Sequence, residues 1–198
     1  MKHAVIFAHP GRQSFTASVA DSYVKTCQGL GHDVLCRDLY RIGFDPCLKA
    51  EELPTAGAFK PAADVEAERA LLKSCDVFAL IYPLWLNTPP AILKGYLERV
   101  FGFGFAYGGS GHSYNPLLTG RKLISFSSSG APTNWVEQSG AFSAIQTLFD
   151  SYFAELCGMV SLQHVHFGAI IAGASEFYIR AKLDEVAKTV HTHFGRRE

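Results

Sequence analysis

Groups that could bind an anion gather in one short segment near the start of the chain, His9-Pro10-Gly11-Arg12-Gln13-Ser14-Phe15-Thr16. An apolar run at residues 4–8 precedes this segment and a helical pattern follows it, as in the strand, loop and helix of a parallel sheet. The free N–H groups at the start of that helix, together with Arg12 and the hydroxyls of Ser14 and Thr16, could hold a phosphate or pyrophosphate. Simple capping of the helix by Ser14 explains the same pattern about equally well.

Two later loops carry groups suited to a flat heterocycle. The segment Pro83-Leu84-Trp85-Leu86-Asn87-Thr88-Pro89-Pro90 follows an apolar run at residues 77–82, and its prolines restrict a loop whose tryptophan could form one wall. The segment Ser127-Ser128-Ser129-Gly130-Ala131-Pro132 ends another strand-like run, and its small side chains leave N–H groups open to ring carbonyl oxygens. A Trp85 packed beneath the next helix and a plain polar turn are the structural alternatives.

A glycine-rich segment at residues 102–118 brings Tyr107, His112 and Tyr114 close together in the chain, in a loop that could cover such a site. His112 is a conceivable proton donor there, because an imidazole exchanges protons near neutral pH. The last helix and the fifth strand carry further histidines, of which His164 and His166 alternate on one face. No cysteine or carboxylate cluster adjoins these two, so we favour structural roles for them and expect no metal site.

Several other chemistries are disfavoured by what the loops do not contain. The first loop has neither the GxGxxG pattern of a dinucleotide-binding Rossmann domain nor the GK[ST] of a P-loop. The run Gly108-Gly109-Ser110-Gly111-His112 breaks the GxSxG pattern of a serine nucleophile at its last position.

The surrounding pattern alternates between strand and helix. We predict strands at residues 4–8, 33–39, 77–82 and 122–128 and a fifth within 159–171, with helices at 14–29, 62–74, 90–101, 138–157 and near the C-terminus. We expect a long connection at residues 40–61, and Glu66, Glu68 and Arg69 on the water-facing side of their helix. Five such units predict one parallel sheet with helices on both faces. Ligands in such folds bind beyond the carboxyl ends of the strands, where the three loops would meet.

Composition narrows the class of protein. With 198 residues and 48% apolar content, the chain is expected to form a single domain, residues 1–198, with an ample core. Eighteen basic and eighteen acidic side chains cancel, so nothing indicates nucleic acid or an anionic membrane. No apolar run is long enough to insert into a membrane. The five cysteines are odd in number and lack a CxxC pair, which favours reduced thiols and a cytoplasmic location.

Three segments together resemble a known family. AHPGRQSFT (residues 8–16), YPLWLNTPPAILKGYLERVFGFGFAY (82–107) and SSSGAP (127–132) are similar to the flavodoxin-like NAD(P)H:quinone oxidoreductases, a family that includes flavoprotein ancillary subunits of bacterial potassium-efflux systems. The resemblance implies a three-layer α/β sandwich with a five-stranded parallel sheet in the order 2-1-3-4-5. It also implies an enzyme that passes hydride from NADH or NADPH, through bound FMN (alternatively FAD), to quinones or similar acceptors by a ping-pong mechanism.

The same resemblance assigns roles to individual residues. The flavin phosphate region would contact His9, Ser14, Phe15 and Thr16; the ring would lie against Pro83, Leu84, Trp85, Leu86 and Asn87; and its polar edge would meet Ser128, Ser129, Gly130 and Ala131. Tyr107 matches a family tyrosine at the mouth of the substrate site, which is often contributed across a dimer interface, so a homodimer is expected.

The chain also departs from the family. The mammalian-type quinone reductases use a tyrosine and a histidine in the stretch that corresponds to residues 132–140, and this stretch contains neither. Ala131 stands where the family usually has a second glycine. Two other functions therefore stay open: a regulatory flavoprotein subunit of a membrane potassium-efflux system, and an electron-carrier flavodoxin, although carriers usually have an acidic surface and this chain is neutral.

Overall fold

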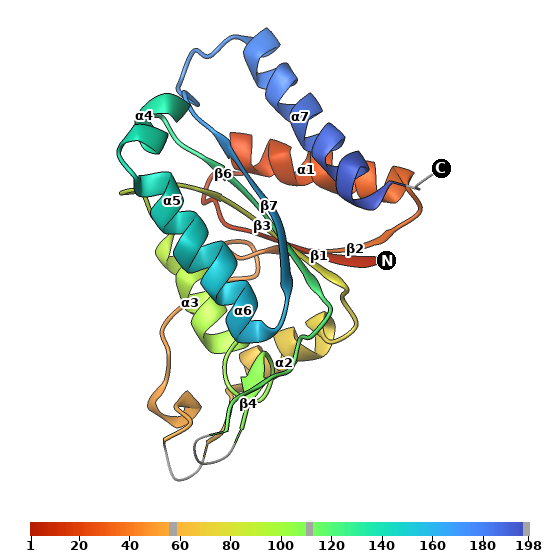
Figure 1. The fold of residues 1–198 in the computed structure, drawn as a ribbon, viewed down its shortest axis with the longest axis vertical. Helices are drawn as coiled ribbons and strands as arrows, with labels where there is room; N and C mark the ends of the chain where they lie inside the picture. The colour runs from red at the N-terminus through yellow and green to blue at the C-terminus, as the bar shows by residue number, and fades with distance from the viewer. Residues whose placement is uncertain (56–58, 110–112, 196–198) are drawn as a thin grey trace.

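Five strands form one parallel sheet in the computed structural model, which describes residues 1–55, 59–109 and 113–195 (Figure 1). The strands are β1 (Lys2–Phe7), β2 (Asp33–Asp38), β3 (Val77–Pro83), β6 (Lys122–Ser128) and β7 (Val160–Phe167). Their order is β2-β1-β3-β6-β7, and every neighbouring pair is parallel. Because β6 and β7 are the fourth and fifth strands of this sheet along the chain, the predicted order 2-1-3-4-5 is confirmed.

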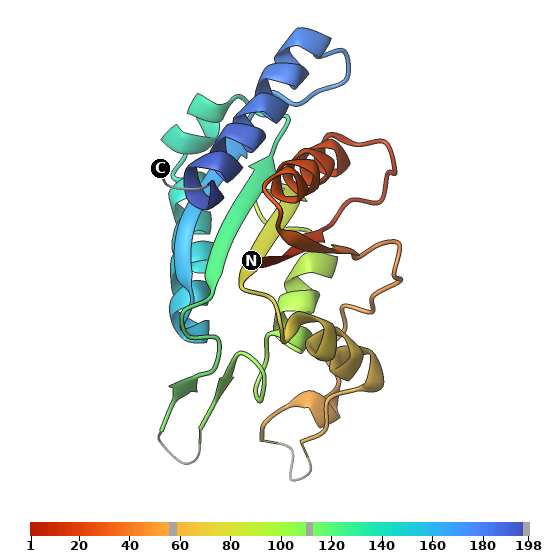
Figure 2. The ribbon, with the colours of Figure 1, turned by 90° about the vertical axis from the view of Figure 1, so that its right-hand side faces the viewer.

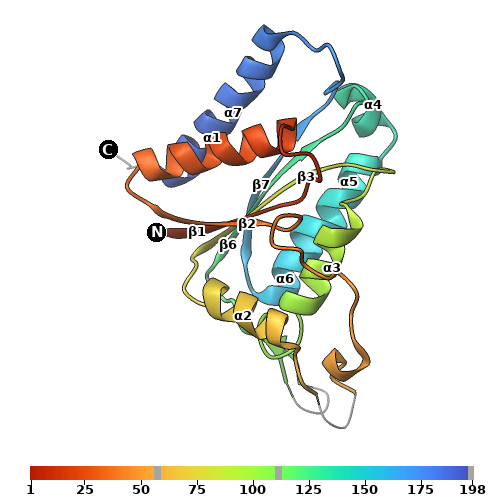
Figure 3. The same ribbon diagram turned by 180° about the vertical axis from the view of Figure 1, so that it is seen from behind.

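Helices cover both faces of the sheet, which confirms the predicted three-layer flavodoxin-like arrangement (Figures 1 and 2). One face packs against α1 (Phe15–Gly29) and α7 (Glu176–Phe194). The other packs against α2 (Ala63–Leu72), α3 (Ala91–Val100), α4 (Thr133–Gln138), α5 (Ala141–Ile145), the π-helical segment η2 (Gln146–Tyr152) and α6 (Phe153–Cys157), as Figure 3 shows from behind. Within the described residues, no helix has both the length and the apolar character needed to cross a membrane.

Local sequence patterns explain most of these elements. Strand β3 is buried along its whole length, as expected for a strand covered on both faces. Helix α1 turns an apolar stripe inward that includes Val19, Tyr23 and Cys27. Ser14 caps α1, and its hydroxyl accepts a hydrogen bond from the Ala17 N–H at 3.1 Å. The predicted start of this helix is therefore confirmed, and with it the place where the first loop must end.

The helix expected at residues 138–157 differs from the structure. It is divided into α4 and a later helix that begins at Ala141 and passes through the π-helical segment η2. The wider π-helical turn displaces the residues that follow from the ordinary 3.6-residue periodicity. An unbroken helix would place Leu148 and Tyr152 on the same stripe as Ala141 and Ile145, but they are 59% and 61% exposed, whereas Asp150 is only 4% exposed.

Two connections contain short elements that the sequence did not indicate. A 3₁₀ turn, Ala50–Glu52, lies within the long connection after β2. The glycine-rich segment contains two short strands, β4 (Tyr107–Gly108) and β5 (Asn115–Pro116), paired antiparallel.

The prediction that Glu68 and Arg69 face water was wrong. Glu68 is 5% exposed, because its carboxylate pairs with Arg37 from β2 and accepts a hydrogen bond from the Tyr96 hydroxyl at 2.8 Å. Arg69 donates hydrogen bonds to the carbonyl oxygens of residues 99, 100 and 103 at the end of α3. Both charged side chains pair with groups on elements distant in sequence, and helical periodicity cannot reveal such partners.

His3 makes the stability of the fold sensitive to acid. It is buried, with its ring nitrogens 2.8 Å from the Tyr23 hydroxyl and 3.0 Å from His32 Nδ1. Burial, followed by the nearby His32, lowers the pKa of His3 to about 4. As the pH falls, His3 is therefore protonated at a higher pH in the unfolded chain than in the folded protein. The stability that neutral His3 contributes to the fold is fully present above pH 6.5 and is lost as the pH falls from 6.5 towards 4. We expect urea unfolding to show a loss of about 2–3 kcal/mol from this source between pH 7.5 and pH 4.5. This loss should be absent in His3→Gln; equal pH dependence in both proteins would contradict the assignment.

Candidate functional site

A cavity of 790 Å³ lies at the carboxyl ends of β1, β3 and β6. The three loops singled out in the sequence meet there, with the loop after β7 as a further wall. The predicted residues that line the cavity are His9, Ser14, Phe15, Thr16, Pro83, Leu84, Trp85, Ser128, Ser129 and Gly130. A site assembled from loops so distant in sequence follows from the parallel sheet, which places the carboxyl ends of all its strands on one edge.

The start of α1 forms an anion-binding corner of this cavity. The Ser14 hydroxyl satisfies the Ala17 N–H, and the Ser14 carbonyl accepts from the Ser18 N–H at 3.0 Å. Among the residues that the structure describes, the N–H groups of Phe15 and Thr16 have no acceptor. Two free donors at the positive end of the helix dipole, with Arg12 also on the cavity wall, suit a phosphate.

An aromatic wall stands beside this corner. Trp85 is 43% exposed, and its ring lies 5.9 Å from the ring of His9, inclined at 55°. His9 Nδ1 lies 3.0 Å from the Gly11 N–H and 3.2 Å from the Gly11 carbonyl oxygen, which leaves Nε2 to meet a ligand. A large, half-exposed aromatic side chain at the mouth of a polar cavity can stack on a planar ring.

The polar edge comes from the end of β6. The Leu84 N–H donates to the Ser128 carbonyl at 2.6 Å, and the Ser129 N–H donates to the Phe167 carbonyl at 3.0 Å. These bonds fix the loop between β3 and β7. The N–H of Gly130 has no acceptor in the part of the chain that the structure describes. It is therefore available to a carbonyl oxygen or ring nitrogen of a ligand.

Three residues expected to contact the ligand do not line the cavity within this chain: Leu86, Asn87 and Ala131. Ala131 faces the loop after β7, where its carbonyl accepts from the Ala169 N–H at 2.8 Å and from the Ser129 hydroxyl at 3.0 Å. Leu86 and Asn87 form the tip of a tight turn in which Trp85 and Thr88 exchange two backbone hydrogen bonds of 3.1 Å. The turn carries their side chains away from the cavity wall.

This turn is strained. Leu86 and Asn87 have φ values of 52° and 57°, which a two-residue turn of this kind requires and which glycine and asparagine adopt far more readily than leucine. Leu86 is also 99% exposed. We predict that Leu86→Gly raises the free energy of unfolding of the flavin-free protein by about 0.5–1 kcal/mol, measured by urea denaturation.

The Asn87→Gly variant is the matched control, because asparagine already tolerates the left-handed conformation, and its stability should change little. A destabilised Leu86→Gly variant would show that the leucine side chain makes contacts that outweigh the strain.

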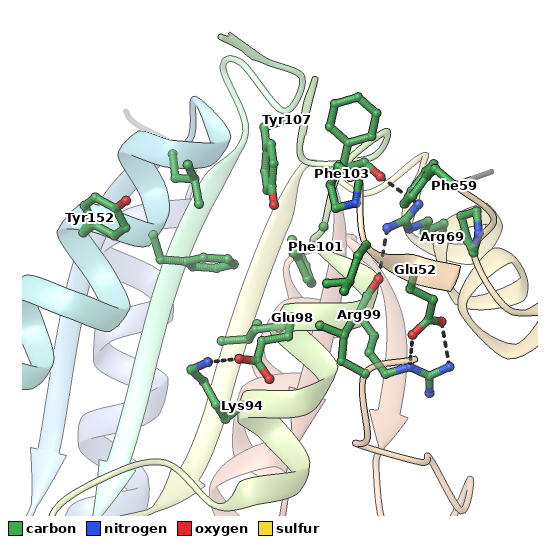
Figure 4. Close-up of a pocket in the computed structure, with 18 of the residues that line it drawn as sticks. Glu52, Phe59, Arg69, Lys94, Glu98, Arg99, Phe101, Phe103, Tyr107 and Tyr152 are labelled. Atoms are coloured by element: carbon green, nitrogen blue, oxygen red, sulfur yellow. Dashed lines mark hydrogen bonds and ion pairs between the residues drawn. The ribbon is translucent and has the colours of Figure 1, made fainter. Parts of the chain in front are cut away.

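The tyrosine expected at the mouth of the substrate site lies elsewhere. Tyr107, on β4, projects into a separate apolar pocket of 330 Å³ between the end of α3 and the η2–α6 segment (Figure 4). Figure 1 shows β4 at one end of the molecule and α4, which follows the polar edge, at the other. His112 lies outside the described residues. Within one chain, Tyr107 is therefore not brought together with the cavity at the strand ends.

Sequence reasoning missed one wall and one polar network. Residues 170–174, after β7, line the cavity with the apolar sequence Ile-Ile-Ala-Gly-Ala, so no chemical motif marks them. Asp21, one turn along α1 from the anion-binding corner, also lines the cavity. His164 and His166 lie in a chain of hydrogen bonds that ends at Ser129. Their alternation on one strand was the available signal, but it does not reveal their partners.

Comparison with known proteins agrees with this geometry. A family model described as "Flavodoxin-like fold" matches residues 1–190. An uncharacterized NAD(P)H oxidoreductase of Haemophilus influenzae is 33% identical over 171 residues, covering 86% of this chain and 85% of the relative. The solved NAD(P)H:quinone oxidoreductase of Methanothermobacter marburgensis is 25% identical, covers 100% of this chain and 99% of its own, and superimposes with a TM-score of 0.85.

A second solved structure shares the fold. The FMN-dependent NADH-azoreductase of Bacillus anthracis, solved in complex with FMN, is 16% identical, covers 97% of this chain and 98% of its own, and superimposes with a TM-score of 0.75. With a family model that spans nearly the whole sequence and a relative this similar over most of both chains, the chain belongs to the flavodoxin-like NAD(P)H:quinone oxidoreductase family.

Proposed function

We propose that the protein is a flavin-dependent NAD(P)H oxidoreductase that passes hydride from NAD(P)H, by way of the bound flavin, to quinones or similar acceptors in a ping-pong cycle. The observation that carries this proposal is the convergence of three different contacts on one 790 Å³ cavity. These are free N–H groups for a phosphate, an aromatic wall for a ring, and polar groups for the edge of that ring. Family membership supports the same activity.

Each part of the cavity has its own task. Ser14, Phe15 and Thr16 would hold the phosphate at the start of α1, with Arg12 adding positive charge. Trp85 and the prolines around it would keep the ring in one plane, while Ser129 and Gly130 would donate hydrogen bonds to its polar edge. A bound flavin supplies the capacity to accept and return a hydride. The protein orients it and stabilises negative charge at the edge through the free Gly130 N–H.

FMN is the flavin we propose, with FAD as the alternative. The anion-binding corner offers the two free N–H groups at the start of α1, which suit a terminal phosphate. Asp21 lines the next turn of α1, where its negative charge would disfavour the second phosphate of FAD. Binding of FMN and FAD by the same preparation, measured side by side, decides between them; tighter binding of FAD would overturn this choice.

We also propose that the protein works as a homodimer, with β4 of one copy close to the cavity of the other. The apolar pocket around Tyr107 is lined by Phe103 and by the exposed Leu148 and Tyr152, a surface that association would cover. Such a dimer would bring Tyr107 to the site that its own chain does not supply. Light scattering that shows a monomer at micromolar concentration would contradict this arrangement. All five cysteines are free, so we propose a reducing, cytoplasmic location.

The test of the activity is a steady-state assay of the flavin-loaded protein with NADH or NADPH and menadione. We expect oxidation of the dinucleotide that depends on the quinone, with parallel double-reciprocal lines as the quinone concentration is varied. The same assay, run with both dinucleotides, establishes which of the two is preferred. A protein that binds flavin but oxidises neither dinucleotide would instead favour the electron carrier or the transporter regulator.

A further inference from the structure

A ladder of polar side chains runs through a part of the sheet that should be apolar. On β6, Ser125 and Ser127 point to the face covered by η2, and they are paired in register with His164 and His166 on β7. Figure 1 shows β6 and β7 side by side with the α5–α6 helices along them. Strands buried on both faces of a parallel sheet are normally continuous apolar runs, and burying polar groups there costs free energy unless all are paired. This cost indicates that the ladder has a function beyond packing.

Hydrogen bonds join this ladder into one unbroken chain. His164 Nδ1 lies 2.7 Å from Asp150 Oδ2, and His164 Nε2 lies 2.7 Å from the Ser127 hydroxyl. The Ser127 hydroxyl lies 2.9 Å from His166 Nδ1, and His166 Nε2 lies 3.0 Å from the Ser129 hydroxyl. Ser129 lines the ligand cavity, so the chain leads from a buried carboxylate to the proposed polar edge of the flavin.

The geometry allows two complete arrangements that differ by one proton. With both imidazoles neutral, Ser129 donates to His166, His166 donates to Ser127, and Ser127 donates to His164, whose Nδ1–H donates to Asp150. With a second proton on His164, every bond between His164 and Ser129 reverses, and the Ser129 hydroxyl turns to the Ala131 carbonyl at 3.0 Å or to a ligand. Asp150 faces the charged ring in the second arrangement, so the buried pair stays neutral overall.

The position of Asp150 supports a role beyond packing. It lies in the π-helical segment η2 and is 4% exposed. A π-helical turn is uncommon and is found frequently at functional sites. Here it places the carboxylate against His164 and Ser125, whose hydroxyl donates to Asp150 Oδ1 at 2.6 Å. Burying a carboxylate with these two contacts costs more free energy than filling the same space with an apolar side chain.

We propose that Asp150, His164, Ser127, His166 and Ser129 form a proton relay that ends at the polar edge of the cavity and compensates the negative charge that hydride transfer brings there. The inference rests on the proposed function. NAD(P)H gives up a hydride and leaves as NAD(P)⁺, so that two electrons and one proton enter the site. One further proton then moves from His164 through Ser127, His166 and Ser129 to the polar edge. Quinone reduction consumes that hydride and that proton, and a solvent proton entering at Ser129 restores the relay; no electrons pass along it.

The surroundings allow at most one positive charge on the pair of histidines. Burial, followed by the charge of His164, lowers the pKa of His166 to about 4, so the two rings are not charged together. Tyr82, from β3, contacts the His164 ring with centroids 6.0 Å apart, and burial and then Asp150 raise its pKa well above its usual value. Tyr82 therefore stays neutral. Phe142, from α5, faces both imidazoles without adding charge.

The first experiment uses ¹⁵N NMR of the imidazoles in the flavin-free protein, because it does not depend on the proposed activity. When His164 takes up its proton, the proton on His166 should pass from Nδ1 to Nε2 at the same pH. Ser127→Ala removes the link between the rings and should abolish this coupling. Ser125→Ala is the matched control, because it likewise removes one hydroxyl from β6. Ser125 contacts Asp150 but does not lie between the two histidines, so this variant should keep the coupling. A His166 tautomer that ignores the protonation of His164 in the wild-type protein would overturn the relay.

The second experiment measures the NAD(P)H half-reaction of the flavin-loaded variants by stopped flow. We expect Ser127→Ala to slow it by about 100-fold, the lower end of the effect of a proton-transferring group, and Ser125→Ala to stay within about twofold of the wild-type rate. Equal rates in all three proteins would overturn the relay while leaving the proposed activity intact. Failure of every protein to bind flavin would overturn the proposed function instead, and the NMR result would then stand by itself.

Discussion

Replacing Ser14 by aspartate is expected to weaken flavin binding by about a hundredfold without harming the fold. Asp is as good a helix cap as Ser, so the bond that the Ala17 N–H makes to residue 14 should persist in the variant. The new carboxylate would lie beside the proposed phosphate position. Two unit charges about 5 Å apart repel by about 3 kcal/mol at an effective dielectric constant of 20, which corresponds to about two orders of magnitude in Kd. Titration with FMN, followed by fluorescence, gives the comparison.

The control for this variant is Ser14→Asn, which keeps a neutral capping side chain of the same shape as aspartate. It should bind flavin within a few-fold of the wild-type protein. Urea unfolding of the flavin-free proteins should show Ser14→Asp at least as stable as wild type, because a negative charge at a helix N-terminus is favourable. Unchanged FMN binding in Ser14→Asp would mean that the start of α1 does not hold the phosphate.

Replacing Arg99 by methionine is expected to cost about 3–5 kcal/mol of stability, since it leaves a buried carboxylate without its cation. Arg99 is 2% exposed and donates two hydrogen bonds of 2.9 Å to Glu52, with two more to Asp64. Burial alone would raise the pKa of Glu52, but hydrogen bonds from Arg99 and from two backbone N–H groups outweigh it and hold that pKa below its usual value. Glu52 is thus charged at neutral pH, and its bonds to Arg99 join the connection after β2 to α3. Chemical denaturation at pH 7 measures the loss.

A second replacement separates the charge from the packing. Adding Glu52→Met to Arg99→Met removes the stranded carboxylate and should recover most of the lost stability, because a buried pair replaced by apolar groups is often nearly neutral. Lys94→Met is the surface control: Lys94 pairs with Glu98 on the exposed side of α3 (Figure 4), and its loss should cost less than about 1 kcal/mol. A double variant no more stable than Arg99→Met would show that the arginine acts through its shape.

The fold could be predicted because its signals are local. Apolar runs such as residues 77–82 mark a buried strand, and Ser14 marks a helix start. The order of the strands came from the family resemblance. The buried ion pairs could not be predicted, since Glu68 and Arg37 stand on different elements and only the folded sheet brings them together. The π-helical turn was missed for a similar reason, because it places Asp150 inside against the helical period.

The candidate site divides in the same way. Residues beside a strand end, such as Thr16, Trp85 and Ser129, line the cavity as expected, because a parallel sheet fixes where those ends lie. Leu86 does not line the cavity within this chain, because it lies at the exposed tip of a tight turn with a φ value that leucine rarely adopts. Tyr107 lines a separate pocket and not this cavity, and only a second chain would bring it close. The relay rests on pairing between strands, which is set by register.

Titration of the purified flavin-free protein with FMN tests the central claim most directly. If the cavity beyond β1, β3 and β6 holds an isoalloxazine ring against Trp85, FMN fluorescence should be quenched and should saturate at one flavin per chain. The complex should be yellow after free FMN is removed. A folded protein that leaves the fluorescence of FMN and FAD unchanged up to millimolar concentration would contradict the account.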